Sequence, residues 1–322
     1  MKKPPVKPGE PPIATRRQFL TGGTRLAAAA SLSFGTMGAF IREAQAATAP
    51  DINLTLLAAG VTVLDGAGCN VLAIKGPDGA LLVDGGYAKH SKELLAAVAK
   101  ATGSAKVHTL FNTHWHPAQT GSNEAVGKQG GMIVAHEVTR LYLSRPVASV
   151  DYDGLYGPLT EKGRPTVVTR SKGWLDFAGR HVEYGYLPAA HTNGDLYIHF
   201  PEQNLLVAGG PVCSESWPLL DWRNGAWLGG LVKAHEKLVS LSKPDTRVVP
   251  ANGKLIDGID LRRQHQMYAA FHQKMVVFQN KGMDSNDCIA ARPLKDHEAQ
   301  FGDPAKFIYG AFQSLNLAYS PD

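Results

Sequence analysis

Cysteine is scarce in this sequence. Its 322 residues include three, Cys69, Cys213 and Cys288, which are widely spaced and odd in number. A small fold held together by disulfides is therefore excluded, because such folds carry an even set of closely placed cysteines. The apolar fraction of 44% is instead typical of a packed globular protein with a sizeable core.

Two common catalytic signatures are also missing. The chain has no glycine-rich loop of the P-loop or dinucleotide-binding kind, and "GAFQSL" near its end contains no nucleophile elbow. Nucleotide chemistry and serine-hydrolase chemistry are therefore set aside.

The apolar run nearest the start is too short to span a membrane. It covers Leu26–Ile41, is rich in Ala and Gly, and falls below the roughly 20 residues that a spanning helix needs. The paired-arginine motif "TRRQFL" (Thr15–Leu20) precedes it, and the small-residue site "AQA" (Ala44–Ala46) follows it. Residues 1–46 thus predict a cleaved twin-arginine export signal and a periplasmic protein without a stable membrane span; an uncleaved membrane anchor is the alternative.

The mature chain lacks an excess of charge. Of the 33 Lys and Arg and 28 Asp and Glu residues, seven and two lie in the first 46 positions, which leaves 26 of each sign. The net charge of +5 therefore belongs to the signal. With no basic surplus in the mature protein, the sequence argues against a nucleic-acid partner.

The sequence beyond Asp51 shows no linker, charge block or low-complexity segment. The order strand pair, helix, strand occurs twice, over 69–86, 91–102 and 107–114, and again over 195–210, 227–241 and 246–253. The tail reads as helical, with one long helix ending at Gly282. We predict one domain over 47–259 and a helical C-terminal extension over 260–322 packed on it. Whether the tail's apolar face also meets a second copy is open, as is the oligomeric state.

The segment Asn112–Asn123, "NTHWHPAQTGSN", suggests a metal site. His114 and His116 lie two positions apart where a strand passes into a loop, so both imidazoles can turn to one ion. A third histidine, His191 in "HTNGD", would complete a three-histidine face with an open fourth position, which lowers the pKa of a bound water to about 7. The alternative is that these histidines are satisfied by local hydrogen bonds.

The motifs "LLVDGG", "THWH", "HTNGD", "VAGG" and "VPANG" resemble, in order and spacing, those of the metallo-β-lactamase superfamily across residues 52–260. The resemblance implies an α/β fold, an αββα sandwich, with a metal site at the edge where loops of both halves meet. It also implies that His114, His116 and His191 share one ion. The export signal and the helical tail are more loosely similar to periplasmic metallo-hydrolases found near quinoprotein and sulfur-oxidation systems.

The resemblance also implies that this chain has lost the ligands of a second metal ion. The family holds a second ion with side chains at four positions that are Ala118, Gln119, Gly210 and Asn252 in this chain. Pro211 takes the place of Gly210 if the alignment shifts by one residue, and it is no ligand either. Ala and Gly offer no donor, and neutral amides are poor ligands for zinc. The sequence therefore predicts a site for one ion.

Neighbouring residues have supporting roles in this scheme. Asp84 lies where the family keeps a carboxylate behind the metal histidines, although it could simply cap the turn into the glycines that follow it. Asp195 resembles the family's structural aspartate. Trp115 is expected in the core or on the pocket wall. The roles of Cys213 and Glu215, which could supply a replacement ligand, stay open.

Five further histidines have no partners in sequence, and we interpret them as structural or solvent-facing: His136, His199, His235, His265 and His272.

The leading functional hypothesis is an exported hydrolase with one Zn²⁺ on the three histidines, whose hydroxide attacks an ester, lactone or amide. The position of the family's water-orienting aspartate is Ala118, so hydrolysis should be slow, and Gln119 could orient water or substrate without accepting a proton. The rival is a non-catalytic binding or accessory protein that kept the fold and pocket. A mononuclear iron site is the third option. A small molecule is the expected ligand, with its identity set by the irregular loop over 141–173.

Overall fold

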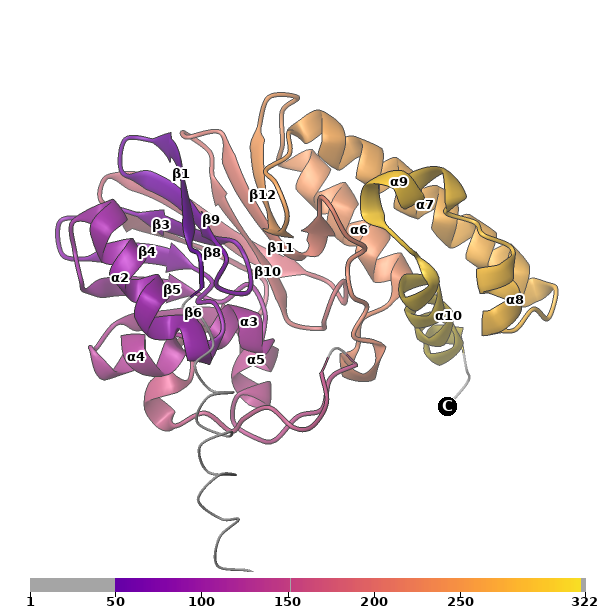
Figure 1. Cartoon of the computed structure of the whole chain (residues 1–322), viewed down its shortest axis with the longest axis horizontal. Helices are drawn as coiled ribbons and strands as arrows, with labels where there is room; N and C mark the ends of the chain where they lie inside the picture. The colour runs from indigo at the N-terminus through magenta and orange to yellow at the C-terminus, as the bar shows by residue number, and fades with distance from the viewer. Residues whose placement is uncertain (1–49, 151, 320–322) are drawn as a thin grey trace, which may run out of the picture. The chain divides into compact units, whose positions relative to one another are not determined.

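Two β-sheets face each other in the part of the chain that the structure describes (Figure 1). The structure is a computed structural model, and it describes residues 50–150 and 152–319. The predicted export signal lies outside these residues. None of the helices described here is long and apolar enough to cross a membrane.

The first sheet has seven strands in sequence order, and its last four, from β4 to β7, run parallel. Its strands are β1 (Asn53–Ala58), β2 (Val61–Asp65), β3 (Val71–Ile74), β4 (Ala80–Val83), β5 (Val107–Phe111), β6 (Met132–His136) and β7 (Val167–Thr169). The strand pair predicted over 69–86 is the antiparallel pair β3 and β4.

The second sheet has five strands in the order β12-β11-β10-β9-β8, with only β11 and β12 parallel. Its strands are β8 (Lys172–Phe177), β9 (Arg180–Leu187), β10 (Asp195–Phe200), β11 (Leu205–Cys213) and β12 (Arg247–Asn252). β11 is buried along its whole length because its sheet is covered on both faces.

Helices cover the outer face of each sheet. The bounds of the helices in the described residues are η1 (Ala88–His90), α2 (Ser91–Thr102), α3 (Pro117–Thr120), α4 (Asn123–Lys128), α5 (Glu137–Tyr142), η2 (Glu161–Gly163), η3 (Trp222–Asn224), α6 (Leu228–Ser240), α7 (Gly258–Asn280), α8 (Ser285–Ala290), η4 (Lys295–His297), α9 (Glu298–Phe301) and α10 (Ala305–Tyr319). α2 buries Leu94, Val98 and Thr102, one turn apart, against the first sheet. α6 covers the second sheet in the same way.

The core between the sheets is built from alternate residues of facing strands. Leu72, Leu81 and Phe111 point inward from the first sheet, and Ile198 and Val207 meet them from the second. Helix, sheet, sheet, helix is the layer order, which confirms the predicted αββα fold.

The C-terminal helices form a second core with α6. Leu228 and Leu231 of α6 pack with Tyr268 and Phe271 of α7 and with Phe307 of α10. The predicted tail is thus helical. The expected domain boundary at 259/260 lies within α7, which begins at Gly258 and ends two residues before Gly282.

One edge of the sandwich collects the ends of four strands. β4 and β5 are parallel, as are β11 and β12, so the carboxyl ends within each pair lie together. Asp84 follows β4, His114 lies just beyond β5, and Asn252 is the last residue of β12. The fold therefore brings motifs from both halves of the sequence to one edge.

Candidate metal centre

Local structure places two of the histidines at a strand-to-helix turn. β5 ends at Phe111, and α3 begins at Pro117, whose ring fits the first helical position. His116 is the extended N-cap of α3. His191 lies in the loop before β10, and its backbone N–H donates to Asp195 Oδ2 at 2.7 Å. Asp195 also accepts from the backbone and hydroxyl of Thr192, so it holds this loop.

The three histidines converge. His191 Nε2 lies 3.1 Å from His114 Nε2 and 3.1 Å from His116 Nδ1, and all three nitrogens lie within 4.8 Å of one another. Nitrogen ligands of a tetrahedral zinc, each at 2.0–2.1 Å from the ion, would be about 3.3 Å apart. The three residues are 1%, 4% and 6% exposed, in sequence order. The arrangement therefore fits one ion.

The outward nitrogens of two of these rings have acceptors that cannot donate. His116 Nε2 lies 3.0 Å from Asp221 Oδ2, and His191 Nδ1 lies 2.6 Å from the carbonyl oxygen of Leu219. A carboxylate and a carbonyl both accept, so the N–H of each ring must point outward. The inward nitrogens then carry lone pairs.

The third ring is oriented by a relay. Thr113 Oγ1 donates to Asp84 Oδ2 at 2.8 Å and lies 3.0 Å from His114 Nδ1, which can donate to it. Asp84 therefore supports the triad through Thr113 and not by direct contact. Three lone pairs facing one another at such distances repel unless a cation lies between them, so this donor set fits a metal ion.

Burial sets the charge state of the site. It lowers the pKa of His114 well below its usual value and that of His191 to about 3, so both rings are neutral near pH 7, the form that binds metal. Burial raises the pKa of Asp84 and of Asp195 to about 7. Burial alone would raise the pKa of Asp221, but the hydrogen bonds that it accepts from His116, Asn224 and Ser149 hold it below its usual value.

The triad opens into a cavity of about 530 Å³. The four positions where the second ion's ligands are absent all line it: Ala118, Gln119, Gly210 and Asn252. A Cβ on Gly210 would lie 2.2 Å from His191 Cδ2. The His191 ring therefore occupies the space that a ligand side chain at position 210 would need.

Neither proposed substitute ligand joins the triad. Cys213 lines the cavity, but burial raises its thiol pKa to about 12, so it is protonated near neutral pH. Glu215 is turned to Lys254, with its Oε1 2.9 Å from Nζ. Among the described His, Cys, Asp and Glu residues, the three histidines are the one group of three or more whose ligand atoms lie this close together.

Trp115 packs edge-on against the His116 ring, with ring centroids 4.8 Å apart, and His136 lies outside the triad. Trp115 is fully buried with Tyr142 and Val147. His136 stacks on Tyr186 with ring centroids 4.3 Å apart. The other four histidines named above as structural lie outside the triad as well: His199, His235, His265 and His272.

Sequence reasoning missed Asp221, Thr113 and the Leu219 carbonyl. Thr113 adjoins His114 and could have been suspected from its position. Asp221 lies 105 residues from its partner His116, in an irregular loop after β11. A single carboxylate in such a loop has no spacing signal, and a backbone acceptor has none at all.

Comparison with known proteins identifies the fold family. The sequence profile described as the metallo-beta-lactamase superfamily matches residues 64–253, more than half of the chain. The chain belongs to the metallo-β-lactamase superfamily. A search of curated protein sequences found no significant match.

Solved structures of this superfamily's fold are similar at low identity. A metallo-β-lactamase from Pontibacter korlensis is 22% identical with a TM-score of 0.54, and the match covers 68% of this chain and 99% of that one. The DIM-1 metallo-β-lactamase is 17% identical with a TM-score of 0.54, covering 68% and 98%. The sec-alkylsulfatase Pisa1 from Pseudomonas sp. is 16% identical with a TM-score of 0.60, covering 84% and 52%. At these identities the likeness shows the fold alone.

Proposed function

We propose that this protein is an exported hydrolase with a single zinc ion, which cleaves an ester, a lactone or an amide. His114, His116 and His191 would hold the ion. The observation that carries the proposal is the convergence of three inward nitrogens whose rings are fixed from behind, in a cavity that has lost every side-chain ligand for a second ion. A zinc ion with three neutral imidazole ligands lowers the pKa of a bound water to about 7.

The chain's own groups would do the rest of the work. Asp221 orients the ring of His116, and the Leu219 carbonyl orients that of His191. Thr113, which is held by Asp84, orients the ring of His114. Gln119 and Asn252 line the cavity with neutral amides, which can orient a carbonyl or a water by hydrogen bonds but cannot take up a proton.

The lining of this cavity explains why the reaction should be slow. It contains no Asp, Glu, Lys or Arg side chain among the described residues. General-base assistance typically contributes 10²–10⁴-fold, and no carboxylate is placed to give it. A substrate with a reactive carbonyl, such as a lactone or an activated ester, therefore fits this site better than an unactivated amide.

Metal content tests this proposal. Elemental analysis of the purified mature protein should find about one zinc per chain, and His116→Ala should lose it. His181→Ala is the matched control, because that side chain is 39% exposed and lies outside the triad. If the protein instead held stoichiometric iron and consumed oxygen, the redox hypothesis would replace the zinc hydrolase hypothesis.

A metal-free protein would contradict the hydrolase proposal. If the wild-type protein folded without stoichiometric metal and cleaved no ester or lactone, that result would identify it as a non-catalytic binding protein that kept the cavity. The absence of all four second-ion ligands is the observation that favours this second candidate.

A further inference from the structure

A second cavity adjoins the metal centre. Its volume is about 960 Å³, and it shares four lining residues with the cavity of the triad: Tyr152, Ser216, Trp217 and Leu219. Small-molecule sites usually measure about 300–1,000 Å³. A substrate bound at the triad can therefore extend past Trp217 into the larger space.

The wall of the second cavity is aromatic and firmly packed. Trp217 stacks on Phe307 with ring centroids 5.3 Å apart and an interplanar angle of 11°, and it lies 4.9 Å from Phe301. Its Nε1 donates to the Gly302 carbonyl at 2.8 Å. Tyr309 of α10 adds another ring to the lining. Such a surface suits an alkyl chain or an aromatic ring.

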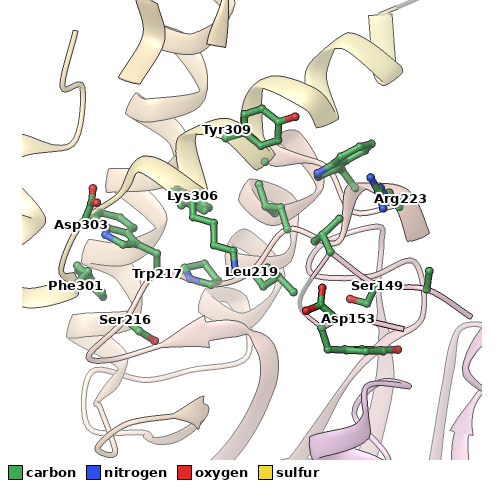
Figure 2. Close-up of a pocket in the computed structure, with 18 of the residues that line it drawn as sticks. Ser149, Asp153, Ser216, Trp217, Leu219, Arg223, Phe301, Asp303, Lys306 and Tyr309 are labelled. Carbon is green, nitrogen blue, oxygen red and sulfur yellow. The ribbon is translucent and has the colours of Figure 1, made fainter. Parts of the chain in front are cut away.

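Two cations of this cavity have no anionic partner. Lys306 and Arg223 line it, and neither lies within 4.0 Å of a carboxylate in the described residues. Figure 2 shows the Lys306 side chain running from α10 into the cavity toward Leu219. The Arg223 guanidinium lies over the Trp222 ring at 5.2 Å from its centroid.

Two carboxylates also line the cavity, and they differ in their surroundings. Asp303 Oδ1 accepts from the backbone N–H of Ala305 at 3.0 Å, so it is engaged at the start of α10. Asp153 lies on the loop opposite α10 and forms no ion pair among the described residues. Asp153 therefore adds a negative charge to the wall opposite α10, whereas Lys306 supplies a positive charge from α10.

We propose that this second cavity binds the anionic end of an amphipathic substrate: an ester or lactone whose acyl or aromatic body lies against Trp217 and whose carboxylate pairs with Lys306. The substrate class rests on the proposed hydrolase function, whereas the anion site itself does not. α10 lies beyond the residues that the superfamily profile matches, so the C-terminal extension takes part in substrate choice.

Binding of a probe pair tests the site without turnover. Octanoate and 1-octanol have the same chain length, and isothermal titration should show octanoate binding at least about fivefold more tightly to wild-type protein. Lys306→Met should remove this preference and leave 1-octanol binding unchanged, and Lys306→Arg should retain it. Asp153→Asn should strengthen octanoate binding, because a repelling charge is lost. Lys281→Met is the matched control, since Lys281 does not line the cavity.

The same titration in the His116→Ala protein separates the two proposals. Octanoate should still bind there, because the cavity of Lys306 contains none of the three histidines. Loss of binding in that variant would mean that the carboxylate binds at the triad, which would overturn the anion site. Equal binding of both probes, or an unchanged preference in Lys306→Met, would overturn it as well. Normal binding without ester or lactone hydrolysis would contradict the proposed function alone.

Discussion

Asp221 accepts hydrogen bonds from three groups in and beside the triad. Its Oδ2 accepts from His116, from Ser149 at 3.0 Å and from Asn224 at 2.9 Å. One carboxylate therefore orients a ligand ring and also ties the loop around residue 149 to the site. Under the proposed function, a group with these contacts would tune the metal affinity through the ring that it orients.

We expect Asp221→Asn to weaken zinc binding by about 10- to 100-fold. The substitution removes the negative charge behind His116 and allows the amide to donate, which favours the wrong tautomer of the ring. Competition with a chromophoric chelator measures the affinity. Asp245→Asn, at an exposed site away from the cavity, is the control. An unchanged affinity would show that Asp221 does not support the ligand.

Among the elements, α6 connects the two cores. Ala234 and Leu238 face the second sheet, while Leu228 and Leu231 face α7 and α10. His235 lies between these faces, fully buried, and its Nδ1 donates to the Leu231 carbonyl at 3.0 Å. Burial lowers the pKa of His235 from 6.5 to about 4. The helix therefore carries a group that resists protonation while the protein is folded.

This shift predicts a loss of stability in mild acid. The unfolded chain takes up a proton near pH 6.5 and the folded chain only near pH 4, so the contribution of His235 is full above pH 6.5 and falls as the pH drops toward 4. Between pH 7 and 4.5 the free energy of unfolding should fall by about 2–3 kcal/mol more in wild type than in His235→Gln. Urea unfolding at the two pH values measures this.

The control for this experiment is His181→Gln, because His181 is exposed. Its free energy of unfolding should fall with decreasing pH as that of wild type does. The buried triad histidines also reduce the stability in acid, and this loss of stability is common to wild type and both variants. Parallel pH profiles of wild type and His235→Gln would show that folding leaves the pKa of His235 unchanged, which would contradict this prediction.

At the scale of the whole molecule, the superfamily sandwich carries an added helical layer. The profile match ends at residue 253. The helices from Gly258 onward pack with α6, and α9 and α10 among them line the larger cavity. The αββα layers place the triad, and the added helices shape what lies next to it. Export of this assembly is our proposal from the paired arginines alone, since residues 1–46 lie outside the described part.

We expect Arg16→Lys combined with Arg17→Lys to block export. Cell fractionation should find the wild-type protein in the periplasm, shortened by about 46 residues, and the variant in the cytoplasm at full length. Lys2→Arg combined with Lys3→Arg, which keeps the charge outside the motif, should export normally. Export that proceeds unchanged in the double-arginine variant would show that another route carries the protein.

Sequence patterns reached the fold and the triad because both depend on short motifs. The alternation of strands and helices is local, and His114, His116 and His191 lie in segments whose spacing resembles the superfamily's. The single zinc and the substrate remain proposals. No motif pointed to Asp221 or to the Leu219 carbonyl, because their roles arise only where loops far apart in the chain meet.

The sequence by itself determined which metal ligands are present and which are absent. Neither Ala118 nor Gly210 has a side-chain donor atom, so neither can coordinate a metal through a side chain in any fold. Only the tertiary structure decided that the His191 ring fills the space beside Gly210, that Thr113 stands between Asp84 and His114, and that Lys306 faces a cavity next to the triad. Chemical identity is a property of each residue, whereas proximity is a property of the folded chain.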